Sequence, residues 1–218
     1  MIKAKRNKPV RYQALFFDFD GVLVESTDIK YRAFRTLYQD CGNTVLERVL
    51  EYLVAHEGIS RVEKIHYCHR KYLGIDLSEA DLAVLTGRYA ALVKDAVVDC
   101  DAVAGAEAFL EAHVGKSPVF VVSGTPEPEL IEIVERRGMG RLFTSVHGSP
   151  RLKGPIVWDL LHKHGLNGSD CLFVGDAMTD CRAAAETGLS FIGRVGEGDH
   201  NPFPDGTTII RDLSELSV

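Results

Sequence analysis

Short apolar runs, rich in β-branched and aromatic residues, recur along this chain between stretches of helical periodicity. Most are apolar at every position rather than at alternate ones, as expected when helices cover both faces of a sheet. Such runs alternating with helical patterns are typical of β-α units on a parallel sheet. The sequence therefore predicts an α/β protein with a doubly wound parallel sheet. The predicted strands lie at residues 14–17, 119–122, 143–146, 172–174, 190–192 and 208–210.

The alternation stops between Ser26 and about residue 98, where four helical patterns follow one another without a convincing strand. A helical block between the first two strands indicates an inserted subdomain at residues 26–98. The segments 12–25 and 99–218 would then form the α/β core. A mixed sheet with strands that are hard to recognise in this segment is the alternative.

Composition limits the partners that the chain can have. Its 218 residues include 25 Lys and Arg against 31 Asp and Glu, a formal net charge of −6. This balance argues against sequence-independent nucleic-acid binding, which needs clustered cations. No apolar run approaches the roughly 18 residues of a membrane span. The basic segment 1–11 lacks the apolar stretch of a signal peptide, and we interpret it as a solvated tail rather than an interaction arm.

The five cysteines form no C-x-x-C pair. An odd number without paired spacing argues against a disulfide framework and favours a reducing cytoplasm. His66 and His69 flank Cys68, but this group lacks the second ligand pair of a structural zinc site. Ordinary residues on a helix surface are the favoured interpretation of these three positions.

Polar residues follow several of the predicted strands at their carboxyl ends. Asp18 and Asp20 follow the first strand, and a glycine comes directly after them. Ser123 follows the second strand and Asp176 the fourth. Ligands of open parallel sheets bind beyond the carboxyl ends of the strands. We therefore expect these acids and this hydroxyl to meet in one site.

The segment from Phe17 to Leu23 resembles the first signature of the haloacid dehalogenase-like (HAD) phosphohydrolases, and Val122-Ser-Gly-Thr125 resembles the second. Lys153 resembles the third, although Gly154 follows it where many members have proline, and Gly175–Asp180 resembles the fourth. The matches occur in family order from residue 14 to about 195. The helical insert resembles the cap of the phosphoglycolate phosphatase and β-phosphoglucomutase-like subgroup. The resemblance implies a Rossmann-like core with an inserted helical cap.

The resemblance implies that Asp18 is a nucleophile that forms an aspartyl-phosphate and that Asp20 is the general acid and base. An ionised carboxylate needs no base to activate it for attack. A second acid two residues later can protonate the leaving alcohol and then deprotonate water. Lys153 would offset the charge of Asp18 and the phosphate, and an exposed lysine is the alternative.

Crowded carboxylates next to a phosphate require a cation, since unit charges 4 Å apart repel by about 4 kcal/mol at an effective dielectric of 20. Oxygen ligands with a substrate phosphate suit Mg²⁺. By the resemblance, Asp18 and Asp176 ligate the ion through carboxylates and Asp20 through its backbone carbonyl. Asp180, one helical turn after Asp176, completes the metal site, more by supporting bound water than by direct ligation.

The resemblance also implies that Ser123 and Gly124 bind the transferring phosphoryl group, where a helix N-terminus attracts phosphate oxygens. Thr125 before Pro126 predicts an N-cap for the helix that follows. In the segment Gly58–Arg61, the Arg61 side chain could hold a second anionic group of the substrate. An Arg61 that points to water is the other interpretation, and both stay open.

These features predict a Mg²⁺-dependent phosphatase acting on a small phosphorylated metabolite. A phosphosugar mutase that uses the same core residues is the alternative. A dehalogenase is disfavoured, because that branch of the family does not keep an acid at the position of Asp20. A non-catalytic family member normally lacks the nucleophile or a metal ligand, and none is missing here.

Overall fold

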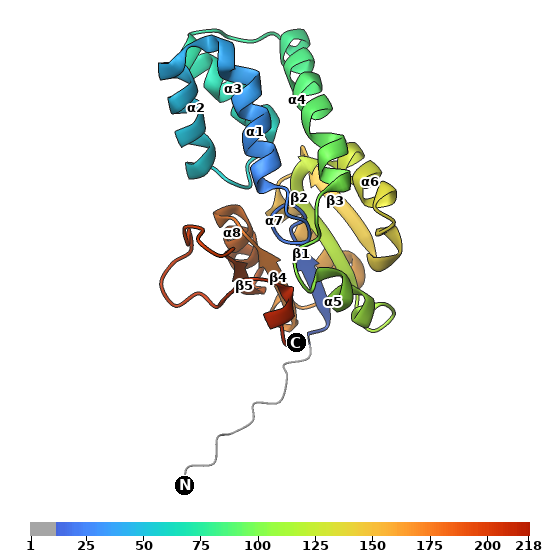
Figure 1. The fold of residues 1–218 in the computed structure, drawn as a ribbon. Coiled ribbons are helices and arrows are strands. Elements are labelled where there is room, and N and C mark those ends of the chain that lie inside the picture. Colours follow the sequence, from blue (N-terminus) through green and yellow to red (C-terminus); the bar gives the residue numbers. More distant parts are fainter. Residues whose placement is uncertain (1–11) are drawn as a thin grey trace.

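A parallel sheet lies at the centre of the computed structural model, which describes residues 12–218 (Figure 1). Its six strands follow the order β3-β2-β1-β4-β5-β6, so the first strand pairs with β2 on one side and β4 on the other. This topology confirms the predicted α/β fold class, and each predicted strand overlaps an observed one. The strands are β1 (Ala14–Phe17), β2 (Val119–Pro126), β3 (Ser145–Ser149), β4 (Cys171–Gly175), β5 (Ser190–Arg194) and β6 (Ile209–Ile210).

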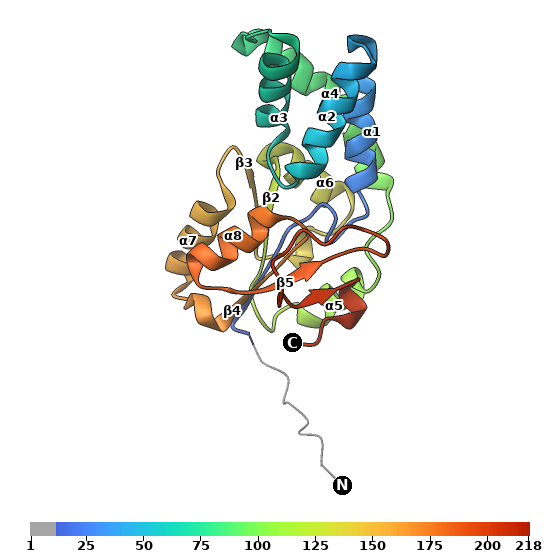
Figure 2. The same cartoon turned by 90° about the vertical axis from the view of Figure 1, so that its left-hand side faces the viewer.

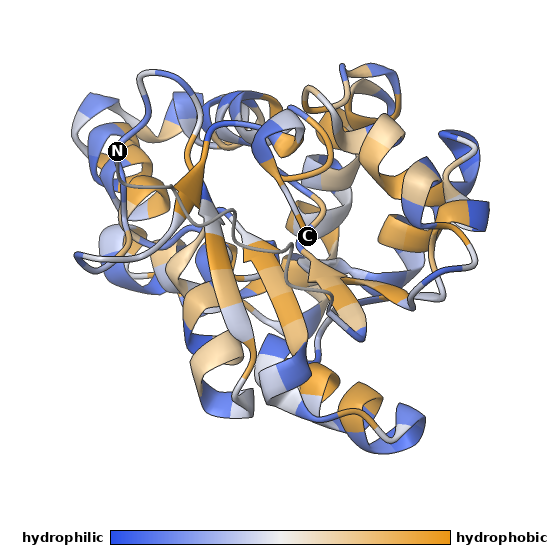
Figure 3. Ribbon diagram, turned by 90° about the horizontal axis from the view of Figure 1, so that it is seen from below, coloured by the Kyte–Doolittle hydropathy of each residue, from blue (hydrophilic) through white to orange (hydrophobic). Residues whose placement is uncertain are grey.

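Both faces of the sheet are covered by helices, which explains why the strand sequences are apolar at successive positions. Leu15 and Phe17 of β1 pack on one side, in the cluster that includes α5 (Ala106–His113) and α6 (Glu127–Arg136). Ala14 and Phe16 pack on the other side, against α7 (Lys153–His164) and α8 (Met178–Thr187). Figure 3 shows the strands as a predominantly hydrophobic layer.

Four helices occupy the segment between β1 and α5, and residues 27–99 contain no strand. The mixed-sheet alternative for this segment is therefore wrong. Figures 1 and 2 show the four helices standing together at one end of the core. We call them the helical insert: α1 (Thr27–Tyr38), α2 (Asn43–Ala55), α3 (Arg61–Cys68) and α4 (Glu79–Asp99).

Short polar signals set the ends of these helices. The Ser60 hydroxyl accepts a hydrogen bond from the Val62 backbone N–H at the start of α3, and Ser78 does the same for Asp81 at the start of α4. Both serines satisfy backbone donors that have no partner inside the helix. Shorter helical turns complete the structure at Gln39–Cys41, His69–Leu73, Gly140–Leu142, Gly168–Asp170 and Leu213–Glu215.

All five cysteines are free thiols, as the absence of paired spacing predicts. Cys68 and His69 are buried inside the insert, so their predicted place on a helix surface is wrong. The His69 imidazole Nδ1 lies 2.8 Å from the Tyr38 hydroxyl, which gives it a packing role. Within residues 12–218, no helix has both the length and the apolar character to cross a bilayer. The predicted basic tail at 1–11 lies outside the described residues.

Candidate active site

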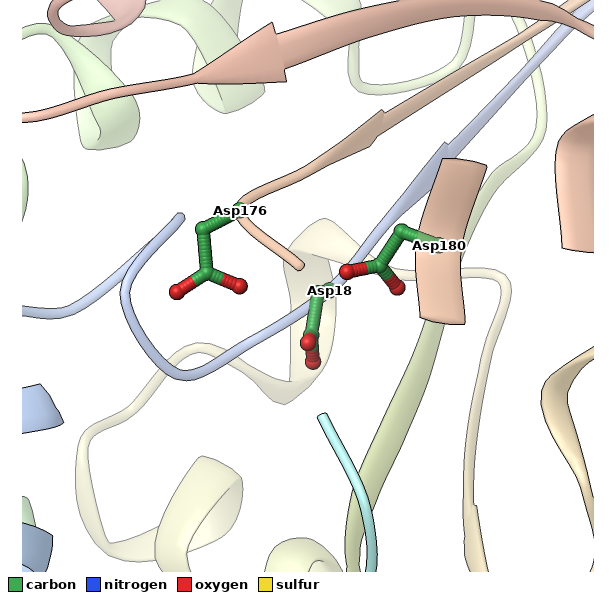
Figure 4. A group of neighbouring side chains, drawn as sticks. All are labelled: Asp18, Asp176 and Asp180. Carbon is green, nitrogen blue, oxygen red and sulfur yellow. The ribbon is translucent and has the colours of Figure 1, made fainter. Parts of the chain in front are cut away.

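Three carboxylates converge at the carboxyl end of the central strands. Asp18 follows β1, Asp176 follows the neighbouring β4, and Asp180 lies in the first turn of α8. Each contributes a carboxylate oxygen to a group whose members all lie within 4.8 Å of one another (Figure 4). Asp18 and Asp180 are buried, and Asp176 is partly buried. The predicted convergence of these acids is therefore present.

Gly21 makes the tight turn after Asp20 possible. Its φ of 71° lies in the left-handed region, which favours glycine. A Cβ atom at this position would also collide with the Asp176 carboxylate. The glycine thus allows the turn after β1 to lie close to Asp176, which follows β4.

Lys153 links two of the three acids. Its Nζ donates to Asp18 Oδ2 at 2.6 Å and to Asp180 Oδ1 at 2.5 Å. The lysine side chain is 6% exposed, which excludes the exposed-lysine alternative. The second oxygen of Asp180 accepts from the Ala177 backbone N–H at 3.1 Å. Asp180 therefore orients Lys153 and the start of α8 with both of its oxygens.

The three acids carry more negative charge than Lys153 balances. Burial raises the pKa of Asp176 well above its usual value, and the charges of Asp18 and Asp180 raise it further. Burial likewise raises the pKa of Asp180 to about 7, although Lys153 opposes this shift. An all-oxygen, electron-rich donor set of this kind suits a hard divalent cation. The residues present thus fit the metal site that the acids predict.

Asp20 turns away from these acids toward the junction with the insert. Its Oδ1 accepts from the Ser26 hydroxyl at 2.7 Å, and its Oδ2 accepts from the hydroxyls of Thr125 at 2.8 Å and Ser123 at 3.3 Å. Lys30 of α1 pairs with Oδ2 at 2.5 Å. Burial alone would raise the pKa of Asp20, but the Lys30 ammonium and the hydroxyls hold it below its usual value.

Thr125 does not cap the helix that follows it, so the predicted N-cap is wrong. Residues 125 and 126 extend β2, and α6 begins at Glu127 without a side-chain cap. The Thr125 hydroxyl instead donates to Asp20 and accepts from Lys30 Nζ at 2.8 Å. The Lys30 ammonium thus occupies the hydroxyl oxygen that a cap would use, and a hydrogen bond from a charged donor is stronger than one from a neutral backbone N–H.

Arg61 reaches from α3 of the insert to the core. Its two terminal nitrogens donate to the two carboxylate oxygens of Glu129 at 2.8 and 2.5 Å. The guanidinium carbon lies 5.2 Å from the centre of the Tyr89 ring. Both members of this ion pair are 11% exposed, which excludes an arginine that points to water. Arg61 also lines the cavity of the site, so its predicted contact with substrate stays a prediction.

A cavity of about 120 Å³ lies between the insert and the core. The core side presents Asp18, Asp20, Asp176 and the Ser123–Gly124 segment. Gly124 lies so near the insert that a Cβ atom there would come within 2.7 Å of the Gly58 carbonyl oxygen. The charged residues that the insert presents to the cavity are Lys30, Glu57, Arg61 and Lys64.

Several of these residues are not identified from the sequence. Lys64 lies one helical turn after the predicted residue Arg61, and that spacing places both on the same helix face. Lys30 lies one helical turn after Ser26, where the predicted insert begins. Glu57 immediately precedes the Gly58–Arg61 segment. Tyr89 of α4 also lines the cavity, whereas the side chain of the neighbouring Arg88 is exposed.

Comparisons with known proteins agree with this geometry. The family model for the haloacid dehalogenase-like hydrolases matches residues 15–194. The 6-phosphogluconate phosphatase of Escherichia coli K12 is 24% identical over 214 residues, which cover 94% of this chain and 93% of that protein.

Solved structures share the fold at low sequence identity. A predicted phosphoglycolate phosphatase from Haemophilus somnus 129PT has a TM-score of 0.73 at 19% identity, covering 94% of this chain and 96% of that one. A β-phosphoglucomutase from Clostridium difficile has a TM-score of 0.74 at 17% identity, covering 94% and 93%. Because the family model covers most of the chain, the protein belongs to the haloacid dehalogenase-like hydrolases and is an enzyme of that family.

Proposed function

We propose that the protein is a phosphatase that hydrolyses a small phosphomonoester through an aspartyl-phosphate on Asp18. The observation that carries this proposal is the arrangement of two carboxylates in distinct settings. Asp18 is buried against the Lys153 ammonium, whereas Asp20, two residues later, is held by hydroxyls at the edge of the cavity. Two acids in different environments suit two different chemical roles.

Asp18 would act as the nucleophile. The Lys153 ammonium lies 2.6 Å from its Oδ2, and an ionised carboxylate needs no base for activation. A bond forms between an Asp18 carboxylate oxygen and phosphorus as the bond from phosphorus to the leaving oxygen breaks. Ser123 and Gly124, at the cavity floor, would bind the phosphoryl oxygens through hydroxyl and backbone donors.

Asp20 would move the protons of both steps. Protonated Asp20 gives its proton to the leaving alkoxide and then takes one from the water that attacks the aspartyl-phosphate. Inorganic phosphate leaves, and the Asp18 carboxylate is regenerated. The ion pair with Lys30 favours the ionised form of Asp20. This is the form that accepts the proton when water attacks the aspartyl-phosphate.

Asp18 and Asp176 would hold Mg²⁺ through their carboxylates and Asp20 through its backbone carbonyl, with Asp180 supporting the site through Lys153. The three-acid cluster supports this assignment. When bound, the ion would neutralise the crowded carboxylates and the substrate phosphate.

The helical insert would serve as a cap over the cavity. It contributes part of the cavity wall, so a bound substrate would lie between two parts of the protein. Such enclosure excludes bulk water and disfavours large substrates such as folded phosphoproteins. The E. coli relative, by its name, acts on 6-phosphogluconate, a small phosphorylated metabolite.

A phosphosugar mutase is the second candidate, because the fold is shared with a β-phosphoglucomutase and Arg61 stands at the cavity. The two activities differ in the acceptor of the phosphoryl group, which is water for the phosphatase and a sugar for the mutase. Interconversion of glucose 1-phosphate and glucose 6-phosphate without phosphate release would favour the mutase.

The test is a phosphate-release assay over a panel of phosphorylated metabolites, with Mg²⁺ and with a chelator. We expect release from a subset of small phosphomonoesters that is lost with the chelator and in Asp18→Asn. Release that persists in Asp18→Asn at the wild-type rate would refute the assigned nucleophile. The cytoplasmic location stays a prediction from the cysteine pattern.

A further inference from the structure

The insert side of the cavity carries a lysine whose charge has no partner. Lys64 lies on α3, one helical turn after Arg61, and lines the cavity. Its side chain is half-buried. In the described part of the chain, its ammonium makes no hydrogen bond or ion pair. A half-buried ammonium without a partner loses hydration that nothing in the protein replaces.

The other cations around the site are already engaged. Lys30 binds Asp20 and Thr125, and Arg61 binds both oxygens of Glu129. In the core, Lys153 joins Asp18 and Asp180. Among the described cations that line the cavity, Lys64 is therefore the one without an ion-pair partner.

The charged groups near Lys64 do not compensate it. Burial, with a smaller contribution from Lys30, lowers the pKa of Lys64 to about 8, and the Glu57 and Asp176 carboxylates oppose this shift only in part. An anionic group placed against Lys64 would restore the missing charge partner.

The insert side of the cavity also carries apolar side chains. Phe34, Leu53 and Ile59 line it beside Lys64. The phosphate-binding groups of the proposed phosphatase belong to the core side. A substrate that spans the cavity would thus place its phosphate at the core, a short carbon chain along the apolar wall and a further group at Lys64.

We propose that Lys64 binds a carboxylate of the substrate, so that the preferred substrate is a phosphorylated organic acid. This inference rests on the proposed phosphatase activity and names its substrate class. A carboxylate matches the single charge of one ammonium. A second phosphate would bring about two charges into a cavity that also holds Glu57. Repulsion by that acid therefore favours the carboxylate.

Matched substrate pairs test the proposal. 6-Phosphogluconate and glucitol 6-phosphate differ only in a carboxylate against an alcohol at the far carbon, and phosphoglycolate and 2-hydroxyethyl phosphate differ in the same way. In at least one pair, we expect the wild-type enzyme to prefer the acid by about 10- to 100-fold in kcat/KM, the range of one hydrogen bond to a charged group. The preference should lie mainly in KM, because binding the carboxylate does not alter the reacting phosphate.

Lys64→Met should abolish this preference while leaving kcat/KM for the neutral phosphates within about twofold. Lys64→Arg, which keeps the charge, should restore part of the preference. Lys71→Met is the matched control, because it makes the same change at an exposed lysine of the insert outside the cavity. It should keep the full preference.

The outcomes separate the two proposals. Absence of phosphate release from every substrate would refute the phosphatase itself. Release without preference for either acid, or an equal loss for both members of a pair in Lys64→Met, would overturn the role of Lys64 and leave the phosphatase standing. A Lys64-dependent preference for glucose 1,6-bisphosphate over both acids would overturn the carboxylate assignment.

Discussion

The core and the insert differ in whether their charged side chains at the site find partners within the same part of the protein. In the core, Lys153 lies between two buried acids, and both oxygens of Asp180 are occupied. In the insert, Lys64 has no partner in the described chain, and Arg61 finds its partner only by crossing to the core. The core site is therefore assembled by the fold alone, whereas Lys64 of the insert depends on a bound ligand for a charge partner. This difference suggests that the core performs the chemistry and that the insert selects the substrate.

Asp18→Asn tests the core side of this comparison and should have the largest effect. Loss of the nucleophile should lower kcat on the order of 10⁴- to 10⁶-fold, measured by phosphate release, with the circular dichroism spectrum unchanged. Asp101→Asn is the control, because Asp101 belongs to a second Asp-x-Asp sequence and is exposed away from the cavity. Comparable loss in both variants would refute a specific role for Asp18.

Lys153→Met and Lys64→Met should differ in stability. Lys153→Met leaves Asp18 and Asp180 buried without their cation, so we expect a loss of about 3–5 kcal/mol in the free energy of unfolding. Lys64→Met removes a half-buried ammonium that makes no ion pair, so the free energy of unfolding should not fall. Urea unfolding at pH 7 measures both. Equal losses would contradict the contrast between core and insert.

Asp176→Asn should stabilise the metal-free protein. The pKa of Asp176 is raised above the usual 3.8 in the folded state, so its ionisation destabilises the fold as the pH rises from that value. The amide cannot ionise, so the variant avoids this destabilisation. Tm should rise by about 2–4 °C for each kcal/mol gained in the free energy of unfolding. The gain should shrink as the pH falls toward 3.8.

Mg²⁺ should raise Tm of the wild-type protein, because a ligand that binds the folded state stabilises it. It should have much less effect on Asp176→Asn. A lower Tm for metal-free Asp176→Asn, or an equal response to Mg²⁺, would argue against a metal site at these acids.

The ion pair between Arg61 and Glu129 should stabilise the contact between the insert and the core. Its effect on the free energy of unfolding should be smaller than that of Lys153→Met. A double-mutant cycle with Arg61→Met and Glu129→Gln should give an interaction energy of about 1–3 kcal/mol in urea unfolding. The exposed pair of Arg141 and Glu111 is the control, with an expected value below about 1 kcal/mol. Equal values for the two pairs would show that the contact does not hold the insert in place.

The sequence predicts the core better than the contacts between core and insert. Asp18 and Asp176 are identifiable because each directly follows a buried strand, and parallel neighbours bring their carboxyl ends together. The insert is identifiable because its residues lack strand-like runs. The wrong N-cap at Thr125 has a tertiary cause, since Lys30 and Asp20, which bind its hydroxyl, come from a distant segment. The partner of Arg61, 68 residues away, likewise depends on how the insert packs against the core.

The stereochemical course at phosphorus tests most directly whether Asp18 carries the phosphoryl group. The experiment uses the phosphorothioate analogue of a hydrolysed phosphomonoester, made chiral at phosphorus with an oxygen isotope. It is hydrolysed in water labelled with a different oxygen isotope, and the configuration of the released thiophosphate is determined. Attack by Asp18 followed by attack by water consists of two displacements, so retention of configuration is predicted. Inversion would show a single direct attack by water and would contradict the covalent mechanism.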